Sequence, residues 1–177
     1  DVARWYDVAT GYDSRDPYSL PRIDGWERDL GSFDLRGKRV AISPTLGAAV
    51  VRDEVQERVV TAAEALARDA GLVIVDLEVA LPTIDVAWAL GNLAGLFEDL
   101  RGRWPECKEE LTPSIAFGLE FAEHVVNLDT VAKGDVSRTE ANEAMAALFD
   151  QVDFVICATN PDTAFPAEVL VNTRVGD

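Results

Sequence analysis

The side chains that could act as nucleophile or base are few and scattered along the sequence. The one histidine, His124, falls in an apolar stretch with helical spacing, and the two cysteines, Cys107 and Cys157, lie far apart. A hydrolase with a serine or cysteine nucleophile also needs a base within hydrogen-bonding distance and hydrogen-bond donors for the oxyanion. Nothing in the sequence indicates an exposed, activated thiol. We expect His124 at a helix end or on the surface, and both cysteines reduced and partly buried.

Metal and cofactor chemistry have equally little support in the sequence. One histidine and two isolated cysteines do not supply the ligand cluster of a zinc site. Adjacent acids such as Asp53 and Glu54 are most simply solvated helix faces. The nucleotide motifs GxGxxG and GxxxxGK[ST] are both absent from the sequence. We therefore predict that this chain holds no catalytic residue, no metal site and no cofactor.

The charge of the chain excludes some partners. The 177 residues include 16 basic and 32 acidic side chains, which gives a net charge of -16. Nucleic acid and anionic membranes would repel such a surface, so we expect neither as a partner. Hydrophobic runs stay well short of the roughly 20 residues that span a bilayer. The sequence starts at Asp1 without a basic-then-apolar leader, as a cut chain would, and we expect a cytoplasmic protein.

The first half of the chain predicts a strand–helix–strand unit. Residues 2–9 resemble the end of a helix, and residues 12–37, rich in Asp, Gly, Ser, Arg and Pro, predict an irregular connection. Residues 39–43 predict a buried strand. Asp53 is the expected N-cap, with Gln56, of a helix that Gly71 ends. Residues 72–79 predict a second strand, which makes parallel pairing the expected arrangement.

The second half predicts three helices and a third strand. The helices are expected over residues 82–103, from Thr112 and Pro113 to about residue 126, and from a capping box at Ser137 to residue 149. The last helix has an alternative start near Asp129, because Gly134 is only a mild helix breaker. Residues 154–157 do not alternate in polarity and predict a strand buried on both faces. The expected fold class is α/β, with a mixed or largely parallel sheet and packed helices.

Three segments, in order, resemble the amidase signature family. Residues 1–17 are similar to a family helix followed by a D-x-x-D-P loop. Residues 39–44 and the helix containing Val55 and Leu66 resemble the next strand and helix. Residues 147–159 are similar to the A-L-F-x-x-x-D-x-L-L-x-P-T element, although Ala158 replaces its proline, and residues 164–166 match the trailing A-F-P.

The resemblance implies a partial domain over residues 1–177, the middle to C-terminal part of an amidase. The family cleaves carboxylic amides through a Ser–cis-Ser–Lys triad that lies earlier in its sequence, with the nucleophile in a Gly/Ser-rich signature. This sequence has no Ser-Ser pair, and Lys38, Lys108 and Lys133 match no catalytic motif, so no catalytic residue carries over. A parent enzyme would bind a small-molecule amide, and the chain alone is expected to be inactive and to self-associate or contact the missing part of its parent.

The segment would then contribute sheet scaffold and part of a substrate pocket. Binding pockets are mostly apolar with a few polar groups. The residues expected in the pocket wall are Trp88, Asn92, Phe97, Phe117 and Phe121. Core packing explains the same aromatic residues equally well. The alternative function is a free-standing acidic α/β interaction domain without catalysis.

Overall fold

The computed structural model describes residues 1–16, 18–166, 168–169 and 174–175. Pro17, which completes the D-x-x-D-P resemblance, lies outside the described residues. The chain divides into two compact units, residues 1–36 and 37–177. Whether the whole chain counts as one partial domain stays a prediction.

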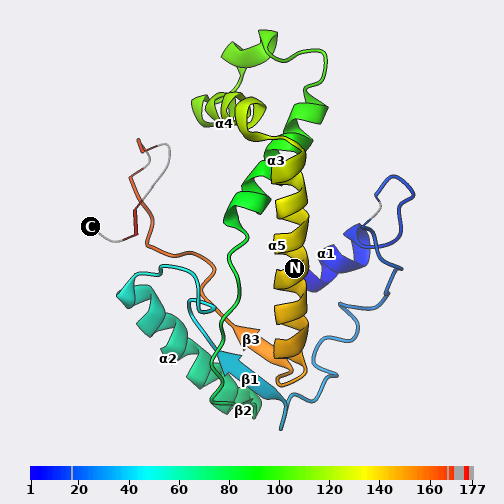
Figure 1. Cartoon of the computed structure of the whole chain (residues 1–177). Helices are drawn as coiled ribbons and strands as arrows, with labels where there is room; N and C mark the ends of the chain where they lie inside the picture. Colours follow the sequence, from blue (N-terminus) through cyan, green and yellow to red (C-terminus); the bar gives the residue numbers. More distant parts are fainter. Residues whose placement is uncertain (17, 167, 170–173, 176–177) are drawn as a thin grey trace. The chain divides into compact units, whose positions relative to one another are not determined.

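The first unit consists of helix α1 (Val2–Ala9) and a series of turns (Figure 1). The Asp7 carboxylate holds the turns by accepting hydrogen bonds from the backbone N–H groups of Gly25, Trp26 and Glu27 at 2.8–2.9 Å. The Tyr6 ring packs on the Trp26 ring with their centroids 5.2 Å apart. One carboxylate thus anchors the start of a turn that also makes its own backbone hydrogen bond, from the Asp29 N–H to the Gly25 carbonyl at 2.9 Å.

The second unit contains the parallel sheet expected from the sequence, with strand order β2-β1-β3. The strands are β1 (Arg39–Ile42), β2 (Val73–Ile74) and β3 (Phe154–Ile156). Val40 pairs with Ile74 on one side and with Phe154 on the other. The α/β class and the parallel βαβ unit are therefore confirmed.

The centre of the sheet is covered on both faces. Neighbouring residues of a strand point to opposite faces, and Val40 and Ala41 are both fully buried or nearly so. Ala41 packs in a core with Val79, Leu148 and Val152, so the end of α5 covers that face. Helix α2 (Asp53–Ala70) contacts β1 and β2, and its Ala63 and Ala67 are buried.

The predictions for β2 and for the start of α2 are wrong in detail. The strand expected over residues 72–79 is regular only at Val73–Ile74, because the chain beyond leaves the edge of β1 to pack Val75, Leu77 and Val79 against the core. Asp53 is the first residue of α2, not its cap. The N-cap is Arg52, which makes no capping hydrogen bond, while the Gln56 side chain donates to the Val51 carbonyl. Gly71 ends the helix in the left-handed conformation, as expected.

Three helices connect β2 to β3. They are α3 (Asp85–Asp99), α4 (Pro113–Val125) and the long α5 (Leu128–Phe149), with a 3-10 turn at Glu106–Glu110 between the first two. Both α4 and α5 contact α3, as Figure 1 shows. None of the helices among the described residues is long and apolar enough to cross a membrane.

The start of α5 corrects the sequence analysis. The helix begins at Leu128, near the alternative start, and Ser137 lies in its interior. The N-cap is Asn127, whose side-chain oxygen accepts from the N–H groups of Asp129 and Thr130, while Thr130 Oγ1 accepts from the Asn127 N–H at 2.8 Å. The Ser-x-x-Glu pattern at Ser137 is thus a false capping box, since an earlier box starts the helix and Gly134 does not interrupt it.

Candidate functional site

The groups that could take part in catalysis are not brought together. Cys107 is buried, Cys157 is exposed, and both are free thiols, so the expectation of a partly buried thiol is wrong for Cys157. His124 is exposed in the last turn of α4, as expected. The Ser114 hydroxyl lies 3.4 Å from Thr112 Oγ1.

The three lysines all pair with carboxylates. Lys38 lies 3.5 Å from Asp153, Lys133 lies 2.7 Å from Asp129, and Lys108 pairs with Glu120. The hydrogen bond from Lys108 to Glu120, with the attraction between their charges, raises the pKa of Lys108 above its ordinary value. A lysine that serves as a base must be neutral, and pairing with a carboxylate stabilises its charged form.

The pocket-wall candidates lie on two helices and do not converge. Trp88 and Asn92 are exposed on α3, and Phe117 and Phe121 are exposed on α4, with 67% of Trp88 and 71% of Phe117 open to solvent. Phe97, which is 40% exposed, lines a cavity of about 180 Å³ between α3 and α4, together with Leu93, Leu119 and Val126. Phe97 is thus the candidate whose surroundings resemble a binding pocket.

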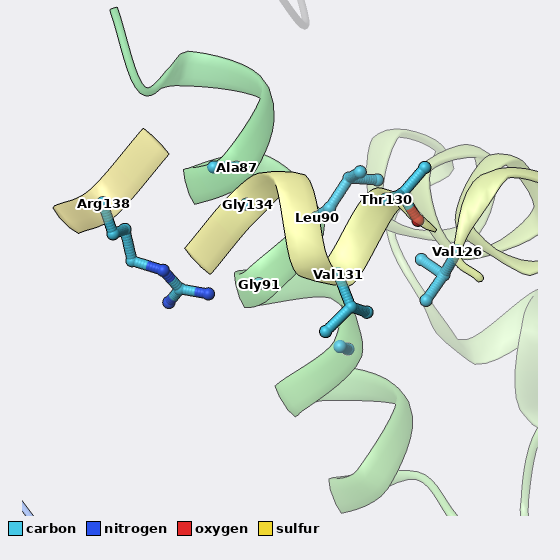
Figure 2. A pocket seen from close by; sticks show the side chains of 9 residues that line it. Ala87, Leu90, Gly91, Val126, Thr130, Val131, Gly134 and Arg138 are labelled. Atoms are coloured by element: carbon cyan, nitrogen blue, oxygen red, sulfur yellow. The ribbon is translucent and has the colours of Figure 1, made fainter. Parts of the chain in front are cut away.

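A second cavity, of about 270 Å³, lies between α3 and α5 (Figure 2). Helix α3 contributes small residues and one leucine, and α5 contributes Thr130, Val131 and Arg138; the full lining is Ala87, Leu90, Gly91, Ala94, Val126, Thr130, Val131, Gly134 and Arg138. This cavity was not predicted from the sequence. The sequence does carry a signal for it, because Ala87, Gly91 and Ala94 follow one another at intervals of four and three residues, which places three small residues on one face of a helix.

A third cavity, of about 480 Å³, follows the carboxyl end of β3. It is lined by residues 160–165 and by Arg174 and Val175, so it includes Ala164 and Phe165 of the A-F-P segment. Asp162 pairs with Arg52 at 3.1 Å, which ties this loop to the start of α2. The chain adds β2 on one side of β1 and β3 on the other, so the order of the strands reverses between β1 and β3. Open α/β sheets bind ligands at such a reversal point, outside the carboxyl ends of the strands.

A carboxylate at the opposite end of the sheet anchors β1 to β3. Asp153 accepts the backbone N–H of Arg39 at 2.7 Å and lies beside Lys38. That backbone hydrogen bond, with the charges of Lys38 and Arg39, holds the pKa of Asp153 below its ordinary value. Among the described residues no group of three His, Cys, Asp or Glu side chains is placed to hold a metal ion.

The profile of the Amidase family matches residues 1–175. The chain belongs to the amidase family. No curated protein matches it. A solved structure of a bacterial aryl acylamidase of the amidase signature family superimposes with a TM-score of 0.66 at 19% sequence identity. The alignment covers 93% of this chain and 37% of that one, so the amidase segment described here spans little more than a third of that enzyme. At this identity the likeness shows the fold, which is a partial amidase-signature fold.

Proposed function

We propose that this amidase chain is a segment of a hydrolase that cleaves carboxylic amides, and that the catalytic triad lies outside it. The observation that carries the proposal is the family match over residues 1–175, in a chain whose lysines are all paired with carboxylates. The triad's serine would form an acyl-enzyme as ammonia or an amine leaves, and water would then release the acid. The substrate of the whole enzyme is a small-molecule amide.

The segment's role is to supply parallel strands and part of the pocket wall. The cavity beyond the carboxyl end of β3 supports this role, because it lies at the sheet's reversal point and includes Phe165 of the family-like A-F-P element. Phe97 is proposed as part of this wall, and its position in the cavity between α3 and α4 supports the proposal. Trp88, Asn92, Phe117 and Phe121 are proposed to complete the wall when the remainder of the enzyme covers them.

The amount of exposed surface supports the need for such cover. The chain exposes 13354 Å². A compact monomer of the same mass exposes about 8,500 Å², and two separate bodies of the sizes of the two units would together expose about 10,000 Å². Edge strand β2 leaves Val73 and Ile74 about half exposed. Exposed strand edges and large apolar patches favour pairing with other chains, so we propose that the isolated chain self-associates.

We further propose a cytoplasmic location, because both cysteines are free and Cys157 is exposed, where an oxidising compartment would promote disulfide exchange. Fractionation of cells expressing the native gene tests this proposal. Recovery of the protein from an oxidising compartment would contradict it.

Ammonia release from a panel of amides, including glutamine and simple aromatic amides, tests the catalytic proposal. The purified chain is expected to show no turnover, while the longer polypeptide that carries the triad turns over at least one amide. In that polypeptide Phe97→Ala should raise KM, whereas Phe149→Ala, an exposed residue outside the cavities described above, serves as the control.

Turnover by the chain alone that disappears in Ser114→Ala or Cys157→Ala would contradict the placement of the triad. A longer polypeptide inactive on every amide would favour the alternative, an acidic interaction domain without catalysis.

A further inference from the structure

The cavity between α3 and α5 combines an apolar lining with a single charged group. Figure 2 shows Arg138 extending from α5 toward Gly91 of α3. A Cβ atom placed on Gly91 would lie 3.9 Å from Arg138 Nη1, so the guanidinium stands directly over the space that the missing side chain leaves. Most of the remaining lining is aliphatic, and Figure 2 shows Leu90, Val126 and Val131 on the side of the cavity away from Arg138.

Thr130 and Arg138, the two polar side chains in the lining, differ in how far they are free to bind a ligand. The Thr130 hydroxyl is engaged at the start of α5, where it accepts from the Asn127 N–H and contacts the Val125 carbonyl at 3.0 Å. Among the described residues the polar partner of Arg138 is Asp135, at 3.3 Å, which is long for a charge-assisted hydrogen bond, and 53% of the Arg138 side chain is exposed at the rim of the cavity. Since a guanidinium carries five N–H donors in a planar fork, Arg138 can still bind a carboxylate in a bidentate manner.

We infer that this cavity binds a small organic monoanion, a carboxylate with an aliphatic or aromatic body. A volume of about 270 Å³ is near the lower limit for ligand pockets and suits a body of roughly ten heavy atoms. One guanidinium matches one carboxylate, whereas a phosphate dianion would meet a single cation on a chain of net charge -16. The proposal concerns binding alone, so it does not depend on the catalytic proposal above.

The probe for this site is 3-phenylpropionate, and its neutral counterpart is 3-phenylpropanamide. Chemical-shift titration of the 177-residue chain, followed at the backbone amides of Gly91, Val131 and Gly134, measures both. A ligand of this size is expected to bind with a dissociation constant on the order of 1 mM. The carboxylate should bind about tenfold more tightly than the amide, because the charged hydrogen bond is lost with the amide.

Variants separate the contribution of the guanidinium to binding from that of the apolar lining. Arg138→Gln should weaken binding of the carboxylate about tenfold and leave binding of the amide unchanged. Gly91→Leu fills the cavity and should abolish binding of both. If Gly91→Leu fails to fold, Val131→Trp occupies the cavity from the partly exposed rim instead. The matched control is Arg101→Gln, which removes an exposed arginine paired with Glu98 outside the cavity and should change neither affinity.

Several results would overturn the inference. Equal affinities for the acid and the amide, or equal losses in Arg138→Gln and Arg101→Gln, would show that the guanidinium does not select the ligand. Titration without saturable shifts at Gly91, Val131 and Gly134 would show that the cavity binds neither probe. Shifts at those residues that depend on protein concentration alone would show that a second copy of the chain occupies the groove.

Discussion

The centre of the sheet and helix α3 are both strongly apolar in sequence, yet they differ in what they bury. In β1, Val40 and Ala41 are enclosed between α2 on one face and the end of α5 on the other. The structure describes every residue of α3, and none of them is buried. Trp88 of this helix is 67% exposed. An apolar element becomes a core only where another layer covers it, and the described part of this chain encloses β1 but leaves α3 without a buried residue.

The comparison predicts that the same charge has very different effects in the two regions. Val40→Asp places an unpaired carboxylate between two covered faces and should cost about 5 kcal/mol, enough to unfold a marginally stable domain. Phe117→Asp, on an exposed face of α4, should change the free energy of unfolding by less than about 0.5 kcal/mol. Urea titration followed by circular dichroism measures both. A folded Val40→Asp protein would show that the sheet centre is not a core.

A second pair of variants compares two positions within α4. Leu119 is fully buried and Phe117 is 71% exposed, although they are only two residues apart. Leu119→Ala should cost about 3 kcal/mol through lost burial and the cavity left behind, whereas Phe117→Ala should cost little. Equal costs in a urea titration would mean that Phe117 is covered in solution, by self-association or by a different packing of α4.

A third pair tests the start of α5. Asn127→Ala removes the oxygen that accepts two backbone N–H groups and should cost about 1 kcal/mol. Ser137→Ala lies in the helix interior, where alanine is the better helix former, and should be neutral or slightly stabilising. Thermal melts of both variants measure the difference. A larger loss for Ser137→Ala would restore the capping box that the sequence suggests.

The smallest expected effect concerns the first unit and its dependence on pH. The N–H of Glu27, followed by those of Trp26 and Gly25, holds the pKa of Asp7 below its ordinary value. A carboxyl group whose pKa is lowered by folding stabilises the fold at every pH above its pKa in the unfolded chain, which is about 3.9. This stabilisation is lost as the pH falls through the lower pKa of the folded chain. Protection of the three amides from hydrogen exchange, measured relative to the intrinsic exchange rate at each pH, should therefore fall below about pH 4.

Asp7→Asn should give fast exchange at those amides already at neutral pH. The matched control, Asp24→Asn, removes a carboxylate that pairs with Arg22 and should leave the exchange unchanged. Identical exchange in the native chain and in Asp7→Asn would show that the carboxylate does not hold the loop.

The elements with strong local signals could be predicted from the sequence. Gly71 ends α2 because its left-handed backbone suits glycine, and Thr112 with Pro113 starts α4, as their types indicate. The short length of β2 could not be predicted, because the chain after Ile74 turns to cover a core formed with Leu148, far away in sequence. The site was missed for the same reason. Gly91 and Arg138 meet only when α3 and α5 pack together.

The central claim is that the apolar faces of this amidase segment need a partner that the chain does not contain. Sedimentation velocity at low and high salt, with binding of a hydrophobic dye, tests it directly. We predict self-association that strengthens at high salt, since screening shortens the reach of the net charge to about 8 Å at physiological ionic strength while contact burial is unaffected. A monomer at both salt concentrations, without dye binding, would contradict the claim and show that the chain is complete by itself.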